Sequence, residues 1–187
     1  MITLIAAIDN NYGLGANGEL LAMIPEDIQH FRMKTLGKIV VMGRTTWFSL
    51  PLRKQKSCCV YKYNTNGELL KKIDCSTHAL KGRVNIVLSH IKEEEFYGAS
   101  LATNINDILE LAKNNDIFII GGASIYKQFY EHADVIELTV FDTIFEEADI
   151  FFPIIYHNDF IVQNQYVLER EDDFDLSFLT LVRRTEQ

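Results

Sequence analysis

Short apolar runs recur along the chain and are separated by longer amphipathic or polar stretches. Residues 2–8 (ITLIAAI) and 38–42 (KIVVM) are almost wholly apolar, which is typical of strands buried on both faces. Comparable runs follow at 85–89, 116–120 and 135–141. Because parallel sheets in α/β proteins are covered on both faces, this pattern predicts a largely parallel central sheet.

A helix is predicted after the first of these runs. It begins at Pro25, a residue favoured at the first helical position, and Glu26 and Asp27 fall in its first turn, where acidic side chains interact favourably with the helix dipole. One face of this helix is expected to carry Ile28, Phe31 and either Thr35 or Leu36.

Two further helices and a C-terminal hairpin complete the pattern. The stretch 106–114 is amphipathic and can be capped by Asn104 or Asn106, and another helix follows near 123–131. Residues 160–183 alternate in two pieces, which is typical of a hairpin. We therefore expect an α/β three-layer sandwich: a mostly parallel central sheet of about eight strands flanked by helices, with a C-terminal antiparallel hairpin.

Residues 51–81 interrupt this regular pattern. They contain all three cysteines of the chain, Cys58, Cys59 and Cys75, and the turn signal Asn64-Thr65-Asn66-Gly67, but no long periodic stretch. A segment of about 30 residues seldom folds alone, so we expect an excursion from a larger domain. The odd number of cysteines, without zinc-ligand spacing, favours reduced thiols in a cytoplasmic protein and predicts no metal site.

The composition is that of an ordinary globular protein with an acidic balance. The 187 residues, of which 48% are hydrophobic, suffice for a single domain over 1–187. The formal net charge of −8 opposes binding to nucleic acid, which depends on Lys and Arg side chains. No apolar run approaches the ~20 residues that cross a bilayer. We therefore expect neither a nucleic-acid nor a membrane partner.

A glycine-rich segment at 13–18 matches the letters of the dinucleotide-binding motif G-x-G-x-x-G. That motif requires its third glycine in a helix packed on the strand, and an acidic residue at the end of the next strand. Here the helix begins only at Pro25, and the next strand ends in Gly43-Arg44. We therefore interpret 13–18 as a mobile loop rather than as a standard Rossmann phosphate loop.

Two other glycine sites follow buried strands and are better candidates for ligand contact. Gly43-Arg44-Thr45-Thr46 places hydroxyls and a guanidinium after one strand, although a solvated surface arginine is also typical there. Ile120-Gly121-Gly122-Ala123-Ser124 follows another strand and fits either a tight turn or close approach to a phosphate. Together they indicate a ligand crevice at the carboxyl edge of the sheet.

These motifs, with others in register, resemble the dihydrofolate reductase family. The residues that carry the resemblance are Ile5-Ala6-Ala7 with Gly15, Ile24 to Asp27 with Phe31 and Thr35, Val41 to Trp47, Gly82 to Ser89, Ile120 to Tyr126 with Phe129, Thr139, and Asp149 followed by Phe152-Pro153. The resemblance covers nearly the whole chain apart from one insertion at about 52–78. It implies reduction of dihydrofolate to tetrahydrofolate by hydride transfer from NADPH.

The resemblance also implies roles for the substrate-binding residues. Asp27 would hold the pterin ring and support its protonation, because the two oxygens of a carboxylate match the ring's amide N–H and amine. Arg83 would grip the substrate's glutamate carboxylate, although Arg53 and Lys56 compete for this role by distance along the chain. The other implied substrate-pocket residues are Ile5, Phe31, Leu50, Ile120, Tyr126 and Thr139.

The residues implied to bind NADPH fall into three groups. Those bordering the nicotinamide are Ala7, Leu14 and Gly15. Those on the adenosine side are Gly43, Arg44, Thr45, Thr46, Leu88, Ser89 and His90. Those lining the pyrophosphate are Gly121, Gly122, Ala123, Ser124 and Ile125, with a cis peptide bond expected between Gly121 and Gly122.

The sequence departs from the family pattern at a few positions. Leu21-Ala22 replaces the usual Pro-Trp, Ser124 stands where many members have a basic residue, and Ile150 replaces a threonine. Two alternatives therefore stay open: a reductase acting on a ribosylated pyrimidine, and a binding or structural protein that has lost turnover. We expect a monomer, with the insertion as the segment that could mediate oligomerisation.

Overall fold

The computed structural model describes most of the chain. The described residues are 1–54, 60–63, 69–73, 76–91, 94–171 and 174–184. Among them, no helix is both long and apolar enough to cross a membrane.

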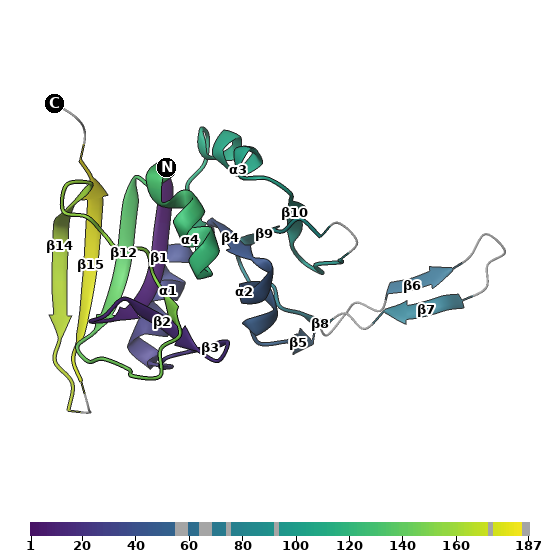
Figure 1. The fold of residues 1–187 in the computed structure, drawn as a ribbon. Helices are drawn as coiled ribbons and strands as arrows, with labels where there is room; N and C mark the ends of the chain where they lie inside the picture. The colour runs from purple at the N-terminus through teal and green to yellow at the C-terminus, as the bar shows by residue number, and fades with distance from the viewer. Residues whose placement is uncertain (55–59, 64–68, 74–75, 92–93, 172–173, 185–187) are drawn as a thin grey trace.

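The core of the fold is an eight-stranded sheet in the order β10-β9-β4-β11-β1-β12-β15-β14 (Figure 1). Its strands are β1 (Ile2–Asp9), β4 (Ile39–Gly43), β9 (Val84–Leu88), β10 (Ser100–Ala102), β11 (Ile117–Ile119), β12 (Val135–Phe141), β14 (Phe160–Leu168) and β15 (Leu176–Arg183). The strands from β10 to β12 are parallel, and β15 and β14 add an antiparallel hairpin. The mostly parallel sheet and the terminal hairpin are confirmed.

Helices cover both faces of this sheet, as expected for three layers. They are α1 (Pro25–Thr35), α2 (Arg44–Ser49), α3 (Ile105–Ala112) and α4 (Ala123–Phe129), followed by the short 3-10 helix η1 (Tyr130–His132). In Figure 1, α4 lies in front of the sheet and α1 behind it. Neighbouring residues of β1 pack on opposite faces of the sheet. Leu4 lies in the cluster that contains residues of α4, and Ile5 lies in the cluster that contains Trp47 of α2.

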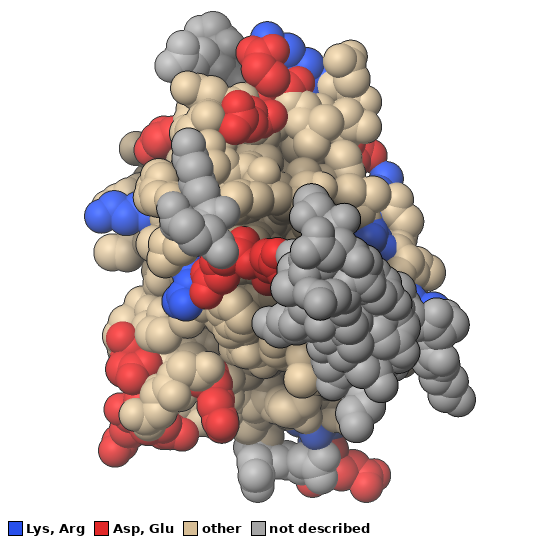
Figure 2. All heavy atoms as spheres, turned by 90° about the vertical axis from the view of Figure 1, so that its right-hand side faces the viewer, with Lys and Arg blue, Asp and Glu red and all other residues tan. Residues whose placement is uncertain are grey.

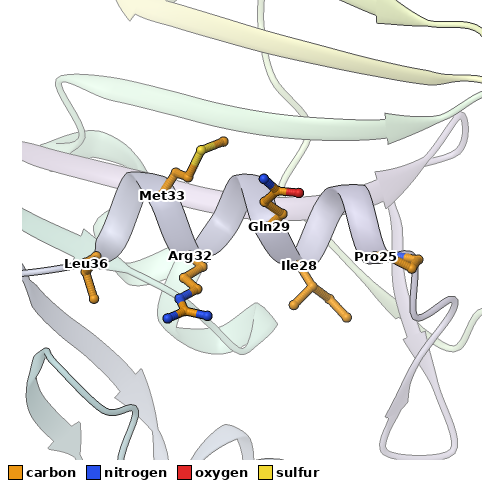
Figure 3. A pocket seen from close by; sticks show the side chains of 6 residues that line it. All are labelled: Pro25, Ile28, Gln29, Arg32, Met33 and Leu36. Atoms are coloured by element: carbon orange, nitrogen blue, oxygen red, sulfur yellow. The ribbon is translucent and has the colours of Figure 1, made fainter.

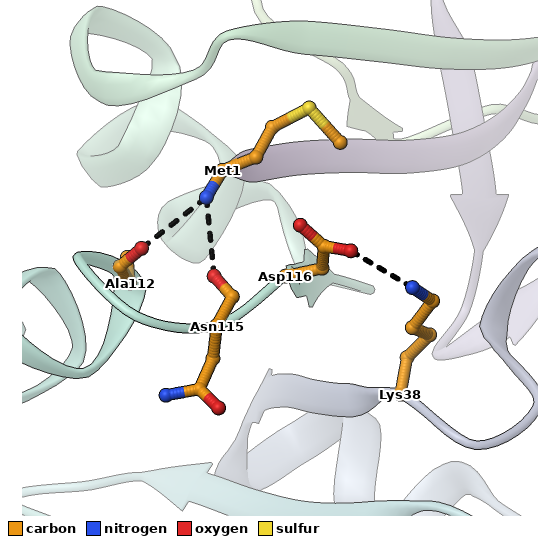
Figure 4. A network of polar contacts seen from close by, with 5 residues as sticks. All are labelled: Met1, Lys38, Ala112, Asn115 and Asp116. Carbon is orange, nitrogen blue, oxygen red and sulfur yellow. Dashed lines mark hydrogen bonds and ion pairs between the residues drawn. The ribbon is translucent and has the colours of Figure 1, made fainter.

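The N-terminus of the chain is anchored beside α3. The Met1 ammonium donates hydrogen bonds to the carbonyl oxygens of Ala112 at 3.2 Å and Asn115 at 3.1 Å (Figure 4). Close by, Lys38 forms an ion pair with Asp116 at 2.8 Å. A positive charge near the last carbonyls of a helix is electrostatically favourable. These contacts tie the start of β1 to the segment that leads into β11.

The glycine-rich segment is a strand and a turn rather than the predicted loop. Gly13–Ala16 forms β2, which pairs with β3 (Glu19–Leu20) and β13 (Ile150–Phe151) in a small antiparallel sheet. The connecting residues Asn17 and Gly18 both have positive φ, the signature of a tight hairpin turn. Our interpretation overlooked this Asn-Gly signal.

A buried carboxylate sets the path of the chain into β2. One oxygen of Asp9 accepts hydrogen bonds from the backbone N–H groups of Asn11 and Gly13, and the other accepts from that of Phe145. Gly15 must be glycine, because a Cβ there would lie 2.5 Å from the carbonyl oxygen of Glu19. The segment is thus held on the carboxyl edge of the large sheet.

The described parts of the insertion at 52–78 form two pairs of short strands, which we call the β arm. Its base is β5 (Arg53–Lys54) paired with β8 (Ser76–Thr77), and further along β6 (Val60–Tyr63) pairs with β7 (Leu69–Ile73). Both pairs are antiparallel, and Figure 1 shows β6 and β7 away from the eight-stranded sheet. The three cysteines lie outside the described residues. The excursion is therefore built from local hairpin pairing.

Helix α3 begins and ends slightly earlier than predicted, and its cap decides between the two candidate asparagines. The side chain of Asn104 accepts a hydrogen bond from the backbone N–H of Asp107 at 3.1 Å, whereas Asn106 lies inside the helix. The third predicted helix likewise ends at Phe129 and continues as η1. Asn104 is thus the N-cap of α3.

Asn104→Ala is expected to lower the free energy of unfolding by about 1 kcal/mol, because the N–H of Asp107 loses its cap. Asn106→Ala, on the exposed part of the same helix, should be neutral or slightly stabilising, since alanine is the better helix former. Urea denaturation followed by circular dichroism measures both variants. Equal losses in the two would contradict the assignment of the cap.

Candidate active site

Asp27 lies in the first turn of α1 and faces β12. Thr139 of β12 hydrogen-bonds its carboxyl group, and β12 aligns Thr139 with Ala7 of β1. Burial raises the pKa of Asp27 above its ordinary value, and the hydrogen bond from Thr139 lowers it in part. The result is a carboxyl group that is poorly hydrated but has a fixed orientation.

Tyr126 of α4 approaches the same place from the other side of β1. Its hydroxyl donates a hydrogen bond of 2.7 Å to the carbonyl oxygen of Ile5, and the ring is buried. Burial, and then the charge of Asp27, raise the pKa of the phenol well above its usual range. Tyr126 therefore stays protonated and fixes the backbone of β1 within electrostatic reach of Asp27.

Apolar side chains from β1, from α1 and from the residues that follow α2 and β11 meet in one cluster. Ile5 belongs to the buried cluster of Trp47 in α2, and Phe31, Leu50 and Ile120 pack against that cluster while remaining partly exposed. These are the four apolar residues that we predicted for the substrate pocket. Phe31 follows Asp27 by one turn of α1, and partly exposed apolar side chains near one half-buried carboxyl group are typical of a site for a flat, mostly apolar ligand.

Arg83 is held firmly next to Phe31. Its Nε and Nη2 donate hydrogen bonds to the hydroxyl of Thr35 at 3.0 and 2.9 Å, and its guanidinium lies 5.6 Å from the centre of the Phe31 ring. Burial, then the charges of Arg32 and Arg53, lower its pKa. Arg53 is therefore a neighbour of Arg83 and not simply a competitor for its role, while Lys56 lies outside the described residues.

The outward side of α1 differs from the prediction. Of the face expected to be apolar and packed, only Thr35 is fully buried; Ile28 and Leu36 are 45% and 52% exposed. Both line an open hollow of about 600 Å³ with Pro25, Gln29, Arg32 and Met33. Figure 3 shows Ile28, Arg32 and Leu36 on the same side of the helix. The outer side of α1 is therefore exposed where the pattern predicted packing.

A second group of predicted residues meets at the ends of β4 and β11. The N–H of Gly43 donates a hydrogen bond of 2.7 Å to the carbonyl oxygen of Gly121, and the peptide bond between Gly121 and Gly122 is cis, as expected. A Cβ on Gly122 would lie 3.3 Å from the hydroxyl oxygen of Thr46. The bare backbone of these glycines thus leaves room beside the start of α2.

The next strand brings the remaining adenosine-side residues to this edge. Leu88 is in register with Gly43, and Ser89, which is buried, accepts a hydrogen bond from the N–H of Ile91 at 3.2 Å. His90, the next residue in the chain, is exposed, and so is Thr45, which follows the neighbouring strand β4. Arg44 is engaged elsewhere: its Nε and Nη2 donate to the two carboxylate oxygens of Glu94 at 2.5 and 2.8 Å.

The other predicted cofactor residues are placed as follows. Ile125 is buried in α4, Ala123 is half-buried, and Ser124 is exposed. Leu14 packs against the larger core cluster, Ala7 packs with Ala22 in a third cluster, and Gly15 accepts a hydrogen bond from the N–H of Asp149. The structure thus brings Gly43, Gly121, Gly122 and Arg44 to one edge of the sheet. The β2 segment lies at the carboxyl end of the neighbouring strand β1.

Four residues near these groups were not predicted as site residues, although Ile28 was expected on the helix face and Arg53 was weighed as a competitor of Arg83. Ile28 and Arg32 follow Asp27 on α1 and line the hollow, Arg53 lies near Arg83, and Glu94 pairs with Arg44. The first two carried a usable signal, since residues separated by one helical turn share a side of the helix.

The face shown in Figure 2 carries acidic side chains interspersed with basic ones among the described residues.

The raised pKa of Asp27 predicts a pH-dependent stability. The folded protein holds this proton more tightly than the unfolded chain, so the free energy of unfolding falls as pH rises from below 3.8 through the folded pKa. Asp27→Asn cannot ionise and should be more stable than the wild type at neutral pH, by on the order of 1 kcal/mol. The gain should vanish below about pH 4.

Asp116→Asn is the matched control for this stability measurement. Its carboxyl group is exposed, and the hydrogen bond from Lys38 holds its pKa below the ordinary value. Losing this ion pair should therefore slightly destabilise the protein at neutral pH, the opposite sign. Chemical denaturation between pH 3.5 and 8 measures both, and an Asp27→Asn variant that is less stable throughout would contradict the burial argument.

Comparison with known proteins places this geometry in a family. A family model described as dihydrofolate reductase matches residues 1–68 and 70–183. A dihydrofolate reductase of Neisseria meningitidis serogroup A is 36% identical over 155 residues, which cover 82% of this chain and 80% of the relative. The dihydrofolate reductase of Bos taurus is 32% identical over 168 residues, covering 81% and 78%.

A solved structure shows the same fold. It is a dihydrofolate reductase from Enterococcus faecalis complexed with NADP(H) and RAB-propyl, with a TM-score of 0.78 and 22% sequence identity. The alignment covers 99% of this chain and 97% of that one. On the family match and the sequence relatives, this chain belongs to the dihydrofolate reductase family.

Proposed function

We propose that this protein reduces 7,8-dihydrofolate to 5,6,7,8-tetrahydrofolate by hydride transfer from NADPH. The observation that carries the proposal is the half-buried Asp27, held by Thr139 and flanked by a partly exposed apolar cluster. Membership of the dihydrofolate reductase family indicates which reaction this acid supports, because the family model and the relatives named dihydrofolate reductase match most of the chain.

Asp27 orients the pterin and promotes protonation of its ring. Its two oxygens accept hydrogen bonds from the amide N–H and the exocyclic amine of the pterin, a bidentate match that fixes the plane of the ring. Addition of hydride to the imine carbon requires the neighbouring ring nitrogen to gain a proton. A carboxylate with little hydration raises the proton affinity of that nitrogen, and water delivers the proton.

The aryl group and the glutamate tail of the substrate extend from Asp27 toward Arg83. Ile5, Phe31, Leu50 and Ile120 pack against the pterin and the aryl group, and Tyr126 holds the strand that carries Ile5. Arg83 binds the glutamate carboxylate through its planar fork, which Thr35 and the Phe31 ring hold in position. The exposed hollow beside Ile28 and Arg32 leaves space for this tail.

The residues at the sheet edge suit NADPH. Glycine backbone at Gly43, Gly121 and Gly122 allows close approach of the pyrophosphate, with Ala123, Ser124 and Ile125 continuing the same surface. Arg44, Thr45, Thr46, Leu88, Ser89 and His90 face the adenosine half, and Ala7, Leu14 and Gly15 border the nicotinamide. When bound, NADPH supplies the hydride, while the β2 segment and the apolar cluster limit access of water.

The alternatives have less support. A binding protein without turnover would not need a carboxyl group such as that of Asp27, oriented by Thr139. The relatives named dihydrofolate reductase also favour the enzyme. We further propose that 1–187 is one domain, that the chain acts as a cytoplasmic monomer unless the 52–78 arm mediates oligomerisation, and that its acidic charge disfavours nucleic acid.

Asp27→Asn tests the proposed chemistry. NADPH oxidation should depend on dihydrofolate in the wild type, and the variant should lower turnover by about 100-fold or more at neutral pH with partial rescue in acid. Glu26→Gln removes a neighbouring exposed carboxylate from the same turn and should keep turnover within about two-fold. Near-normal turnover of Asp27→Asn at neutral pH would contradict the assigned role.

Arg83→Gln tests the position of the substrate tail. Loss of a charged hydrogen bond to the glutamate carboxylate should raise KM for dihydrofolate by about 10- to 100-fold while changing kcat little. 6-Methyl-7,8-dihydropterin, which lacks the aryl group and every carboxylate, should show the same KM with both proteins. An equal rise for both substrates would mean that Arg83 acts by shaping the pocket instead of by binding the tail.

A further inference from the structure

Arg44 is paired within the protein by a bidentate ion pair. Its Nε and Nη2 donate to separate oxygens of Glu94 at 2.5 and 2.8 Å, and its guanidinium lies 5.1 Å from the centre of the Phe48 ring. The hydrogen bond from Arg44 lowers the pKa of Glu94, so the carboxylate stays charged at neutral pH. The fork that would bind a phosphate is thus already occupied by a carboxylate.

The direction of Arg44 identifies which phosphate it would meet. Glu94 belongs to the segment between β9 and β10, on one side of β4, whereas Gly121 and Gly122 follow β11 on the opposite side. The proposed pyrophosphate site is at these glycines. A guanidinium that leans away from them, toward the adenosine half, is placed for the ribose 2′-phosphate, the group that distinguishes NADPH from NADH.

Several positions beside Arg44 carry no positive charge, although the sequence places Lys92 two positions before Glu94. Ser124, exposed at the start of α4, carries no charge, and Arg44 is followed by the uncharged Thr45 and Thr46. The sequence also places Glu93 and Glu95 next to Glu94. A phosphate dianion arriving here gains Arg44 only by displacing one carboxylate, which then remains close to it with the same sign of charge.

We propose that Glu94 competes with the ribose 2′-phosphate of NADPH for Arg44 and thereby narrows the preference of this enzyme for NADPH over NADH. The inference rests on the proposed function, which puts the adenosine half of the coenzyme beside Arg44. Glu94 acts through Arg44 and is a specificity-determining residue, not a catalytic one. Its side chain is 22% exposed and that of Arg44 47%, so both groups can exchange partners without burying a bare charge.

Glu94→Gln provides the test, because it keeps the size of the side chain and removes its charge. Dissociation constants are measured by calorimetry for adenosine 2′,5′-bisphosphate and for adenosine 5′-monophosphate, which differ in the 2′-phosphate. The variant should bind the bisphosphate about three- to ten-fold more tightly and the monophosphate equally. In steady-state assays the KM for NADPH should fall by a similar factor while that for NADH stays constant. Glu94→Ala should shift both quantities in the same direction.

Glu110→Gln is the matched control. It also removes one negative charge and one surface ion pair, that of Glu110 with Lys113 at 2.7 Å on α3, and should change neither nucleotide's affinity. Equal tightening of both nucleotides by Glu94→Gln, or no tightening of either, would overturn the proposal. These binding measurements do not need turnover, so a wild type that binds the bisphosphate but does not reduce dihydrofolate would refute the proposed function alone.

Discussion

The attachment of α1 to β12 is the contact on which the rest of the site depends. Near the start of the helix, Asp27 is hydrogen-bonded by Thr139; about two turns later, Lys34 pairs with the buried Glu137 at 2.8 Å. Glu137 and Thr139 point to the same face of β12 because side chains alternate along a strand. Thr180 of β15 also donates to Glu137 at 3.0 Å. Two polar contacts thus fix both the height and the rotation of the helix on the sheet.

That placement determines how the other parts of the site are arranged. With α1 fixed, Phe31 meets the apolar cluster around Trp47, and Thr35 presents its hydroxyl to Arg83. The acid and the arginine therefore mark the two ends of one elongated surface, separated by aromatic and aliphatic side chains. Such a surface distinguishes a ligand that is polar at both ends and apolar in the middle from smaller ring compounds.

Charge is arranged differently at the two proposed ligand sites. At the proposed site of the substrate tail, burial and then the charges of Arg32 and Arg53 lower the pKa of Arg83, so an anion bound there would relieve repulsion between cations. At the proposed coenzyme edge, Arg44 is paired with Glu94 in the absence of ligand. A site with excess positive charge favours an incoming carboxylate, whereas a site with a paired cation makes the incoming phosphate compete. The overall acidic charge of the chain does not reveal this difference, which depends on where each charge lies.

The sequence by itself determined the parts of this protein that rest on local patterns. Apolar runs located β1, β4, β9, β11 and β12, since a strand buried on both faces needs a continuous apolar segment. Family motifs identified Asp27, Arg83 and the cis-linked Gly121 and Gly122 as candidate residues. The sequence was predictive wherever a local conformation, such as a buried strand or a cis-linked glycine pair, requires a particular type of residue.

Contacts between distant segments, and local alternatives that the sequence left open, were decided only by the structure. The pairing of Gly13–Ala16 with β13 and the choice of Asn104 over Asn106 as cap required the backbone geometry around them. The exposure of Ile28 and Leu36 depends on a hollow that no helical pattern encodes. The pairing of Arg44 with Glu94 joins residues fifty positions apart in the chain. An ion pair of this kind leaves no periodic trace in the sequence, because its energy depends on distance in space and not on spacing along the chain.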